Sequence, residues 1–284
     1  MLKDITLGQY YAADSVIHRL DPRVKFVVTF SYIISLFVIN SFPGYLLAGI
    51  FLAFWVGLSR VPLGFMLRGM RAIFFLLLLT VVFNMFLTPG EVLWQYGVFK
   101  ITREGLTIAA MMTVRLVFLV IGSNVMTLTT TPNHLTDAME ALMRPLKKIR
   151  VPVHEIAMMM SIALRFIPIL MEETDKIMKA QIARGADFES GNIFRRAKNL
   201  IPLLVPLFIS AFRRAGDLAM AMEARCYHGG EGRTKMKPLT YRRRDAIAYL
   251  LLLLYLVLAV VIGRDLFHLQ ELVSSHLFTA GRQG

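Results

Sequence analysis

Two arginines in matching contexts are the residues of this chain best suited to binding chemistry. Arg184 lies in Ala183-Arg184-Gly185 and Arg225 lies in Ala224-Arg225-Cys226, and each tripeptide closes a predicted long helix. A guanidinium group presents five N–H donors in a planar fork, which lets it bind a carboxylate bidentately. One such arginine is explained by its favourable place at the negative end of a helix dipole, with glycine as the usual next residue. Because the motif occurs twice, we favour docking of both arginines into grooves of a partner.

Motifs that would indicate catalysis are incomplete. No Gly-Lys dipeptide occurs, so the chain lacks the phosphate-binding loop of an ATPase. His154-Glu155 begins a zinc-protease motif, but Met158 stands where the second histidine ligand belongs. No nucleophile–base pair is recognisable. We therefore predict no catalytic residue, no metal ligand and no cofactor in this chain, which is not expected to be an enzyme.

The composition indicates a membrane protein with a substantial part in water. Of the 284 residues, 56% are hydrophobic, the mean hydropathy is +0.58 and the formal net charge is +13. The bias of Lys and Arg toward cytoplasmic loops explains this charge better than nucleic-acid binding does. The single cysteine, Cys226, excludes an intramolecular disulfide. We expect no cleaved signal peptide at the polar N-terminus.

Five stretches are apolar enough to cross a hydrocarbon core about 30 Å thick, which takes about 20 helical residues. No β pattern is visible, and backbone groups in lipid require internal hydrogen bonds, so these spans are expected to be helices. The fold class is thus all-α and polytopic, with four spans in 1–130, a cytoplasmic segment of helices in 131–245, and a last transmembrane helix and tail in 246–284. The predicted spans are Val24–Ser41, Tyr45–Leu58, Ala72–Thr88, Gly105–Thr130 and Ala246–Gly263, with a tight turn at Phe42-Pro43-Gly44.

The charges of Thr131–Asp245 set the topology. This segment carries 20 of the 32 basic residues together with 12 acidic ones, spread along its length. Each charge at a bilayer centre costs about 2.5–3.5 kcal/mol, so the segment is expected outside the hydrocarbon. With five spans, it lies on the same side as the basic N-terminal residues. The N-terminus is therefore predicted in the cytoplasm and the C-terminus outside.

Three helices are predicted within this segment. Pro132 suits a first helical position, starting a helix that ends near Met143. Long amphipathic helices follow over Val153–Arg184 and Asn192–Arg225, each about 50 Å at 1.5 Å per residue. Methionines concentrate here, and they either fill a core or form an adaptable surface that accepts different partners. They are Met139, Met143, Met158, Met159, Met160, Met171, Met178, Met220 and Met222.

Three features together resemble the transmembrane T component of energy-coupling factor (ECF) transporters, a branch of the ABC transporters also described as EcfT or CbiQ-like. Ser15–Lys25 resembles the segment that precedes the first span of that family. Leu164-Arg165-Phe166-Ile167-Pro168 followed by Glu172 resembles its first coupling helix, and the two Ala-Arg motifs resemble its paired coupling motifs. The second motif departs from the family because Cys226 stands where glycine is usual. Either Cys226 adopts a left-handed backbone, which is strained at a cysteine, or the helix ends differently there.

The resemblance implies a non-catalytic scaffold in the cell membrane. Arg184 and Arg225 would each insert into a groove on one of two cytoplasmic ABC ATPase subunits, which bind the ATP and Mg²⁺. Movement of the long helices would reorient a membrane-embedded substrate-binding S component that takes up a vitamin or another micronutrient. Membrane lipid is a further expected partner, and nucleic acid is not.

A secondary transporter is the alternative. That class is expected to show internal repeats, broken helices and ionisable residues at mid-membrane. Arg115 is the one ionisable residue deep within a predicted span, and no repeat is recognisable in the membrane half. An arginine facing the helix bundle is the ordinary explanation of Arg115, and a substrate contact is the less favoured one.

Overall fold

The computed structural model describes residues 10–70, 73–96, 99–188, 192, 194, 198–230, 236 and 238–280. The chain divides into two compact units. The first, here the membrane unit, comprises Gln9–Thr131 and Leu239–Gly284. The second, here the insert, comprises Pro132–Pro238, which joins the membrane unit at both of its ends.

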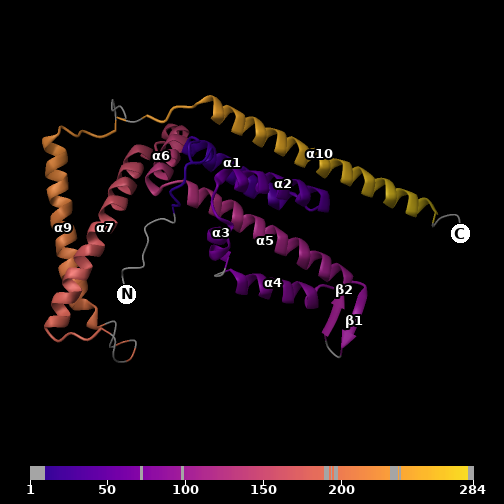
Figure 1. Cartoon of the computed structure of the whole chain (residues 1–284), viewed down its shortest axis with the longest axis horizontal. Coiled ribbons are helices and arrows are strands. Elements are labelled where there is room, and N and C mark those ends of the chain that lie inside the picture. Colours follow the sequence, from indigo (N-terminus) through magenta and orange to yellow (C-terminus); the bar gives the residue numbers. More distant parts are fainter. Residues whose placement is uncertain are drawn as a thin grey trace. The chain divides into compact units, whose positions relative to one another are not determined.

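The membrane unit is built from helices with one short hairpin (Figure 1). α5 packs against α1, α2, α3 and α4, and α10 packs against α1 and α2. The antiparallel hairpin between α4 and α5, which the sequence did not predict, pairs β1 with β2. The elements are α1 Pro22–Val38, α2 Phe42–Ser59, α3 Leu63–Met70, α4 Phe74–Leu87, β1 Val92–Tyr96, β2 Phe99–Thr102, α5 Arg103–Thr129 and α10 Arg243–Ala280.

These helices confirm the all-α polytopic class, although the set of candidate spans differs from the predicted one. Four of the described helices are long and apolar enough to cross a membrane. They are α2, α5, residues Arg243–Gly263 of α10 and, in the insert, α7 (Val153–Ala183). α4 is a shorter apolar helix, and α1, expected as the first span, has 17 residues and is not among the four. α7 qualifies because its first 18 residues carry only two charges, Glu155 and Arg165. The cytoplasmic placement of 131–245 therefore stays a prediction.

The connection between α1 and α2 also differs from the prediction. Phe42-Pro43-Gly44 was expected to be a turn, but these residues form the first turn of α2. Ser41 is the N-cap, and its Oγ accepts a hydrogen bond from the Gly44 N–H at 3.3 Å. A proline at the start of a helix loses no intrahelical bond, so Pro43 begins this helix rather than breaking the chain.

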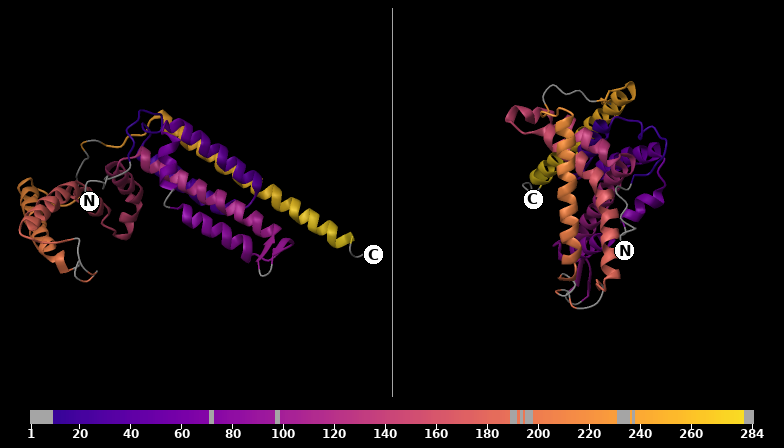
Figure 2. Two further views of the ribbon diagram at one scale, coloured as in Figure 1. Left: turned by 60° about the horizontal axis from the view of Figure 1, so that its bottom comes forward. Right: turned by 90° about the vertical axis from the view of Figure 1, so that its left-hand side faces the viewer.

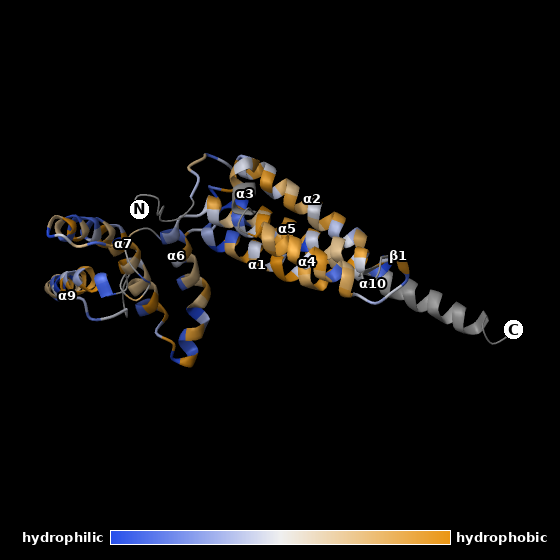
Figure 3. Ribbon diagram, turned by 90° about the horizontal axis from the view of Figure 1, so that it is seen from below, coloured by the Kyte–Doolittle hydropathy of each residue, from blue (hydrophilic) through white to orange (hydrophobic). Residues whose placement is uncertain are grey.

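Aromatic side chains fill the core where α1, α2 and α10 meet. The Phe51 ring stacks on Tyr255 with centroids 4.4 Å apart, and Tyr32 lies against both. The Ser35 and Tyr255 hydroxyl oxygens are 2.7 Å apart within hydrogen-bond distance. Gly122 lets α5 approach α1 closely, since a Cβ there would lie 3.0 Å from the Tyr32 ring. Many apolar side chains of these helices are exposed, as expected of lipid-facing surfaces. Figure 3 shows that hydrophobic residues predominate along the helices of this unit.

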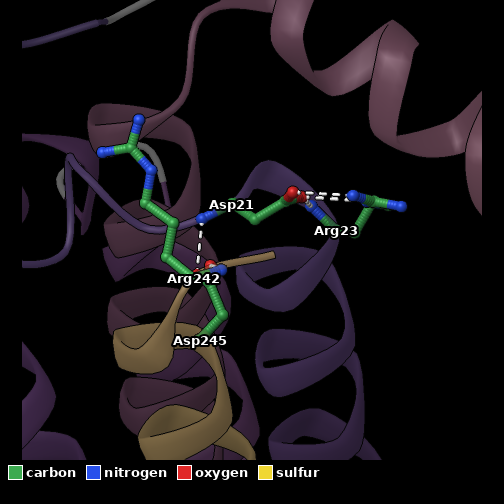
Figure 4. A network of polar contacts seen from close by, with 4 residues as sticks. All are labelled: Asp21, Arg23, Arg242 and Asp245. Carbon is green, nitrogen blue, oxygen red and sulfur yellow. Dashed lines mark hydrogen bonds and ion pairs between the residues drawn. The ribbon is translucent and has the colours of Figure 1, made fainter. Parts of the chain in front are cut away.

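The buried Asp245 carboxylate joins the first turns of α1 and α10 (Figure 4). Its Oδ2 accepts a hydrogen bond from the Arg242 N–H at 2.7 Å, and its Oδ1 accepts one from the Asp21 N–H at 2.9 Å. Asp21 is itself the N-cap of α1, and its carboxylate also pairs with Arg23 at 2.8 Å. The first N–H groups of a helix have no partner within the helix, so one acid here satisfies a donor at each of two helix starts.

A buried lysine ties α1 to the end of α5. The Lys25 Nζ donates hydrogen bonds to the Thr129 carbonyl at 2.8 Å and to the His18 carbonyl at 3.2 Å. Thr129 is the last residue of α5, and the last carbonyls of a helix lack partners and carry partial negative charge. The Lys25 ammonium group therefore caps α5. The points at which the chain leaves and re-enters the membrane unit are thus both fixed to the start of α1.

The insert is a set of packed helices. α6 (Pro132–Met143) confirms the helix predicted at Pro132, and a 3₁₀ segment, η1 (Arg144–Ile149), leads into α7. α7 packs against α6 and against α9 (Ile201–Ala224), which runs antiparallel to it (Figures 1 and 2). α9 starts at Ile201 rather than at the predicted Asn192, with Pro202 in its first turn. Pro168 lies inside α7 without ending it.

Replacing Asp245 tests the joint between α1 and α10. Asp245→Ala leaves two backbone N–H groups without their acceptor, and we expect a loss of about 2–4 kcal/mol in stability. The melting temperature of the detergent-solubilised protein measures this loss. Asp217→Ala removes an exposed carboxylate from α9 and is the matched control. Equal melting temperatures for the two variants would contradict the assigned role of Asp245.

Candidate functional site

The first arginine motif ends α7 in a Schellman motif. Gly185 has a left-handed backbone with φ 87°, and its N–H donates to the Ile182 carbonyl at 2.9 Å. The Ala186 N–H donates to the Gln181 carbonyl at 3.0 Å. These two hydrogen bonds satisfy carbonyls that the last helical turn would otherwise leave without donors. Arg184 is the C-cap residue between them.

The second motif ends α9 in the same way, with cysteine in place of glycine. Cys226 has a left-handed backbone with φ 55°, and its N–H donates to the Glu223 carbonyl at 2.8 Å. The Tyr227 N–H donates to the Met222 carbonyl at 3.1 Å, and Arg225 is the C-cap residue. The backbone geometry of the glycine motif is thus retained at Cys226. An L-residue in this conformation costs about 1–2 kcal/mol.

Both arginines are exposed and free to bind a partner. Arg184 and Arg225 lie in exposed runs, and neither guanidinium group has a hydrogen-bond or ion-pair partner in the part of the chain that the structure describes. Two carbonyls of each last turn accept backbone N–H groups instead. The arginine side chains are therefore not needed to complete the helix ends.

The two arginines lie at opposite ends of the antiparallel pair. Glu173 of α7 and Arg214 of α9 form an ion pair at 3.1 Å between the two helices. Arg184 follows Glu173 by eleven residues, and Arg225 follows Arg214 by eleven residues. Each arginine therefore lies roughly 16 Å of helix beyond the ion pair, in opposite directions along the pair. The structure does not bring the two motifs into one site, and it places them at two separate helix ends of similar backbone geometry.

α9 carries an apolar surface that the described residues leave uncovered. Large apolar side chains are exposed along α9, and the Phe208 and Phe212 rings lie tilted against each other with centroids 4.9 Å apart. Leu203 is the one buried apolar residue described in this helix. The exposed large apolar residues of α9 are Ile201, Leu204, Val205, Phe208, Ile209, Phe212 and Met220.

The methionines of the insert are not core residues. Four of the nine singled out in the sequence are exposed, namely Met139, Met159, Met160 and Met220, and the others are half-buried. This arrangement favours the adaptable surface over the core-filling explanation.

Arg115 has a structural role in the membrane unit. Its Nε donates to the Tyr45 hydroxyl at 2.8 Å, and its Nη2 donates to the Asn40 side-chain oxygen at 2.8 Å and the Ile39 carbonyl at 3.2 Å. Ile39 is the C-cap residue of α1. The guanidinium group thus ties α5 to the end of α1 and to α2, as the bundle-facing explanation expects.

An all-α polytopic membrane protein with two exposed arginine motifs at helix ends has the features of a membrane component of a transport complex. The family described as Cobalt transport protein (CbiQ) matches residues 13–236. The energy-coupling factor transporter transmembrane protein EcfT of Clostridium kluyveri is 55% identical over 263 residues, which are 92% of this chain and 97% of that protein. The EcfT protein of Acidaminococcus fermentans is 53% identical over 91% of this chain and 96% of that protein. The EcfT protein of Bacillus subtilis is 48% identical over 86% of this chain and 93% of that protein. The chain therefore belongs to the family of energy-coupling factor transporter transmembrane proteins.

Exchanging the left-handed residues tests whether the two motifs are equivalent. Cys226→Gly removes backbone strain and should stabilise the end of α9 by about 1 kcal/mol, whereas Gly185→Ala should destabilise the end of α7 by about as much. Hydrogen exchange of the amides at 182–187 and 223–228 measures both effects. Gly216→Ala, in the interior of α9 where a Cβ meets no neighbour, should slow exchange and serves as a control. Faster exchange in Cys226→Gly would contradict the assigned backbone geometry.

Proposed function

We propose that the chain is the non-catalytic coupling scaffold of an ECF-type importer. Arg184 and Arg225 each dock into an acidic groove on one of two cytoplasmic ABC ATPase subunits, where ATP and Mg²⁺ bind. The observation that carries this proposal is the pair of exposed C-cap arginines in Schellman motifs at opposite ends of an antiparallel helix pair, with no partner for either guanidinium group among the described residues. Because the two arginines are separated, they fit docking to two ATPase subunits better than docking to a single subunit.

The exposed apolar surface of α9 is the proposed contact for a membrane-embedded S component. Contiguous apolar side chains at a protein surface mark an interaction site, and flexible methionines let one surface accept partners of different shape. Movement of α7 and α9, driven by ATP binding between the docked ATPases, would reorient the S component and its vitamin or other micronutrient. The specificity for the substrate belongs to that partner.

The proposed topology follows the distribution of basic residues. The N-terminus and the insert lie on the cytoplasmic side of the cell membrane, where the ATPases are, and the C-terminus lies outside. The family membership of the chain supports this proposal, since the relatives are named as transmembrane components of a transporter.

Charge reversal at the helix ends tests ATPase docking. A buried, hydrogen-bonded charge pair at an interface contributes about 2–5 kcal/mol on truncation, so Arg184→Ala or Arg225→Ala should weaken ATPase binding about 30-fold or more. Arg184→Glu and Arg225→Glu should abolish co-purification of the ATPases and coupled uptake in proteoliposomes.

Matched controls place the same charge change elsewhere on the same helices. Lys176→Glu on α7 and Arg213→Glu on α9 alter exposed cations away from the helix ends and should retain the ATPases. Insertion of every variant into the membrane should be unchanged. Wild-type assembly and uptake in the Arg184→Ala/Arg225→Ala double variant would refute the docking role.

A further inference from the structure

His154 connects three parts of the insert that are distant in sequence. It lies in the first turn of α7, and its Nδ1 is 3.0 Å from the Glu140 Oε1 of α6. Its Nε2 is buried and has no hydrogen-bond partner among the described residues. Buried polar atoms without partners are uncommon and costly, by about 1–3 kcal/mol each. The burial of this nitrogen therefore needs a structural reason.

The reason lies in the chain segment that follows the second arginine motif. Gly230 packs directly on the His154 ring: a Cβ added at Gly230 would clash with Cδ2 and would lie 2.8 Å from Cγ and 3.1 Å from the His154 Cβ. Only glycine lets the backbone approach the imidazole this closely. Gly229 beside it has φ 102°, a conformation that directs the chain onto the ring.

Only a few residues separate this contact from Arg225. The Schellman bonds fix the backbone through Tyr227, and the His228 Nδ1 lies within hydrogen-bond distance of the Cys226 carbonyl, at 2.9 Å. Gly230 then fixes the other end of the same short segment against His154. The backbone after Arg225 is therefore held both at the end of α9 and at the start of α7.

We propose that His154 is a positioning residue for Arg225. The Glu140 carboxylate sets the orientation of the imidazole, the imidazole forms the surface on which Gly230 rests, and Gly230 fixes the exit path of the chain from the second motif. The functional part of this inference rests on the proposed docking of Arg225 to an ATPase. The structural part, a contact that immobilises the second motif, does not depend on it.

The native cysteine provides a direct probe of the structural part. Cys226 is the single cysteine of the chain, is exposed and adjoins Arg225, so a nitroxide label on it reports the mobility of the motif without any substitution. His154→Ala removes the supporting ring, and Gly230→Ala places a methyl group against it. Each should shorten the rotational correlation time of the label about twofold or more in the full-length protein.

A double variant separates this specific contact from a general loss of stability. The closest contacts of a Cβ at Gly230 are with the ring atoms Cδ2 and Cγ, which His154→Ala removes. Adding Gly230→Ala to His154→Ala should therefore change the label spectrum much less than Gly230→Ala changes that of the wild type. Gly216→Ala, a glycine replaced in the interior of α9 where a Cβ meets no neighbour, is the control and should not raise the mobility of the label. Wild-type label mobility in both single variants, or effects that add in the double variant, would overturn the contact.

The functional part is tested in the assembled complex. His154→Ala should lower ATPase affinity less than Arg225→Glu does, by about tenfold, because the arginine remains but its position varies. Undiminished ATPase binding by His154→Ala, in a series where Arg225→Glu abolishes it, would overturn the positioning role alone. Undiminished binding by Arg225→Glu would instead refute the proposed docking and leave the label measurements to decide the contact.

Discussion

The membrane unit depends on one buried carboxylate. Asp245 accepts a backbone N–H at the start of α10 and another at the start of α1, so two helices 224 residues apart in sequence begin from a shared acceptor. Lys25, one turn into α1, then caps the end of α5. In a bilayer, orphan backbone groups at helix ends are especially costly, and these contacts satisfy them with two side chains. The same contacts fix the residues of the membrane unit at which the chain leaves for the insert and returns from it.

The sequence predicted most helices because their signals are local. Apolar runs of about 20 residues and a proline at a first helical position identify α4, α5, α6 and α10 without any knowledge of their neighbours. The predicted turn at Phe42–Gly44 was wrong because Pro43 is compatible with both a turn and a first helical turn, and the Ser41 cap decides between them. α7 qualifies as a candidate span despite the many charges of its segment, because those charges lie mainly in its second half. Hydropathy alone does not separate a span from a long amphipathic helix of this kind.

The arginine motifs could be found in the sequence, whereas their supports could not. Two Ala-Arg endings are visible as a repeat, and the strain expected at Cys226 followed from the glycine it replaces. The Asp245–Asp21 and His154–Gly230 contacts join residues 224 and 76 positions apart, and no periodicity or composition links them. Gly229-Gly230 reads in the sequence as a loop signal alone. The requirement for glycine at Gly230 becomes evident only from its contact with the His154 ring in the structure.

The way in which α7 and α9 end distinguishes the two explanations of their arginines. If Arg184 and Arg225 served mainly to complete the helix ends, their donors would be expected to reach the last carbonyls, as cationic side chains at C-termini commonly do. The Schellman bonds already satisfy carbonyls of both last turns with backbone N–H groups. The helix dipole still favours a positive charge there, by about 0.3–1 kcal/mol, but a lysine would supply that equally well. What arginine adds is a rigid five-donor fork, and in both motifs the described residues leave that fork unoccupied. The helix that carries each arginine therefore does not account for donors that the described residues leave without partners, and this is the reason for proposing a carboxylate on another protein as their acceptor.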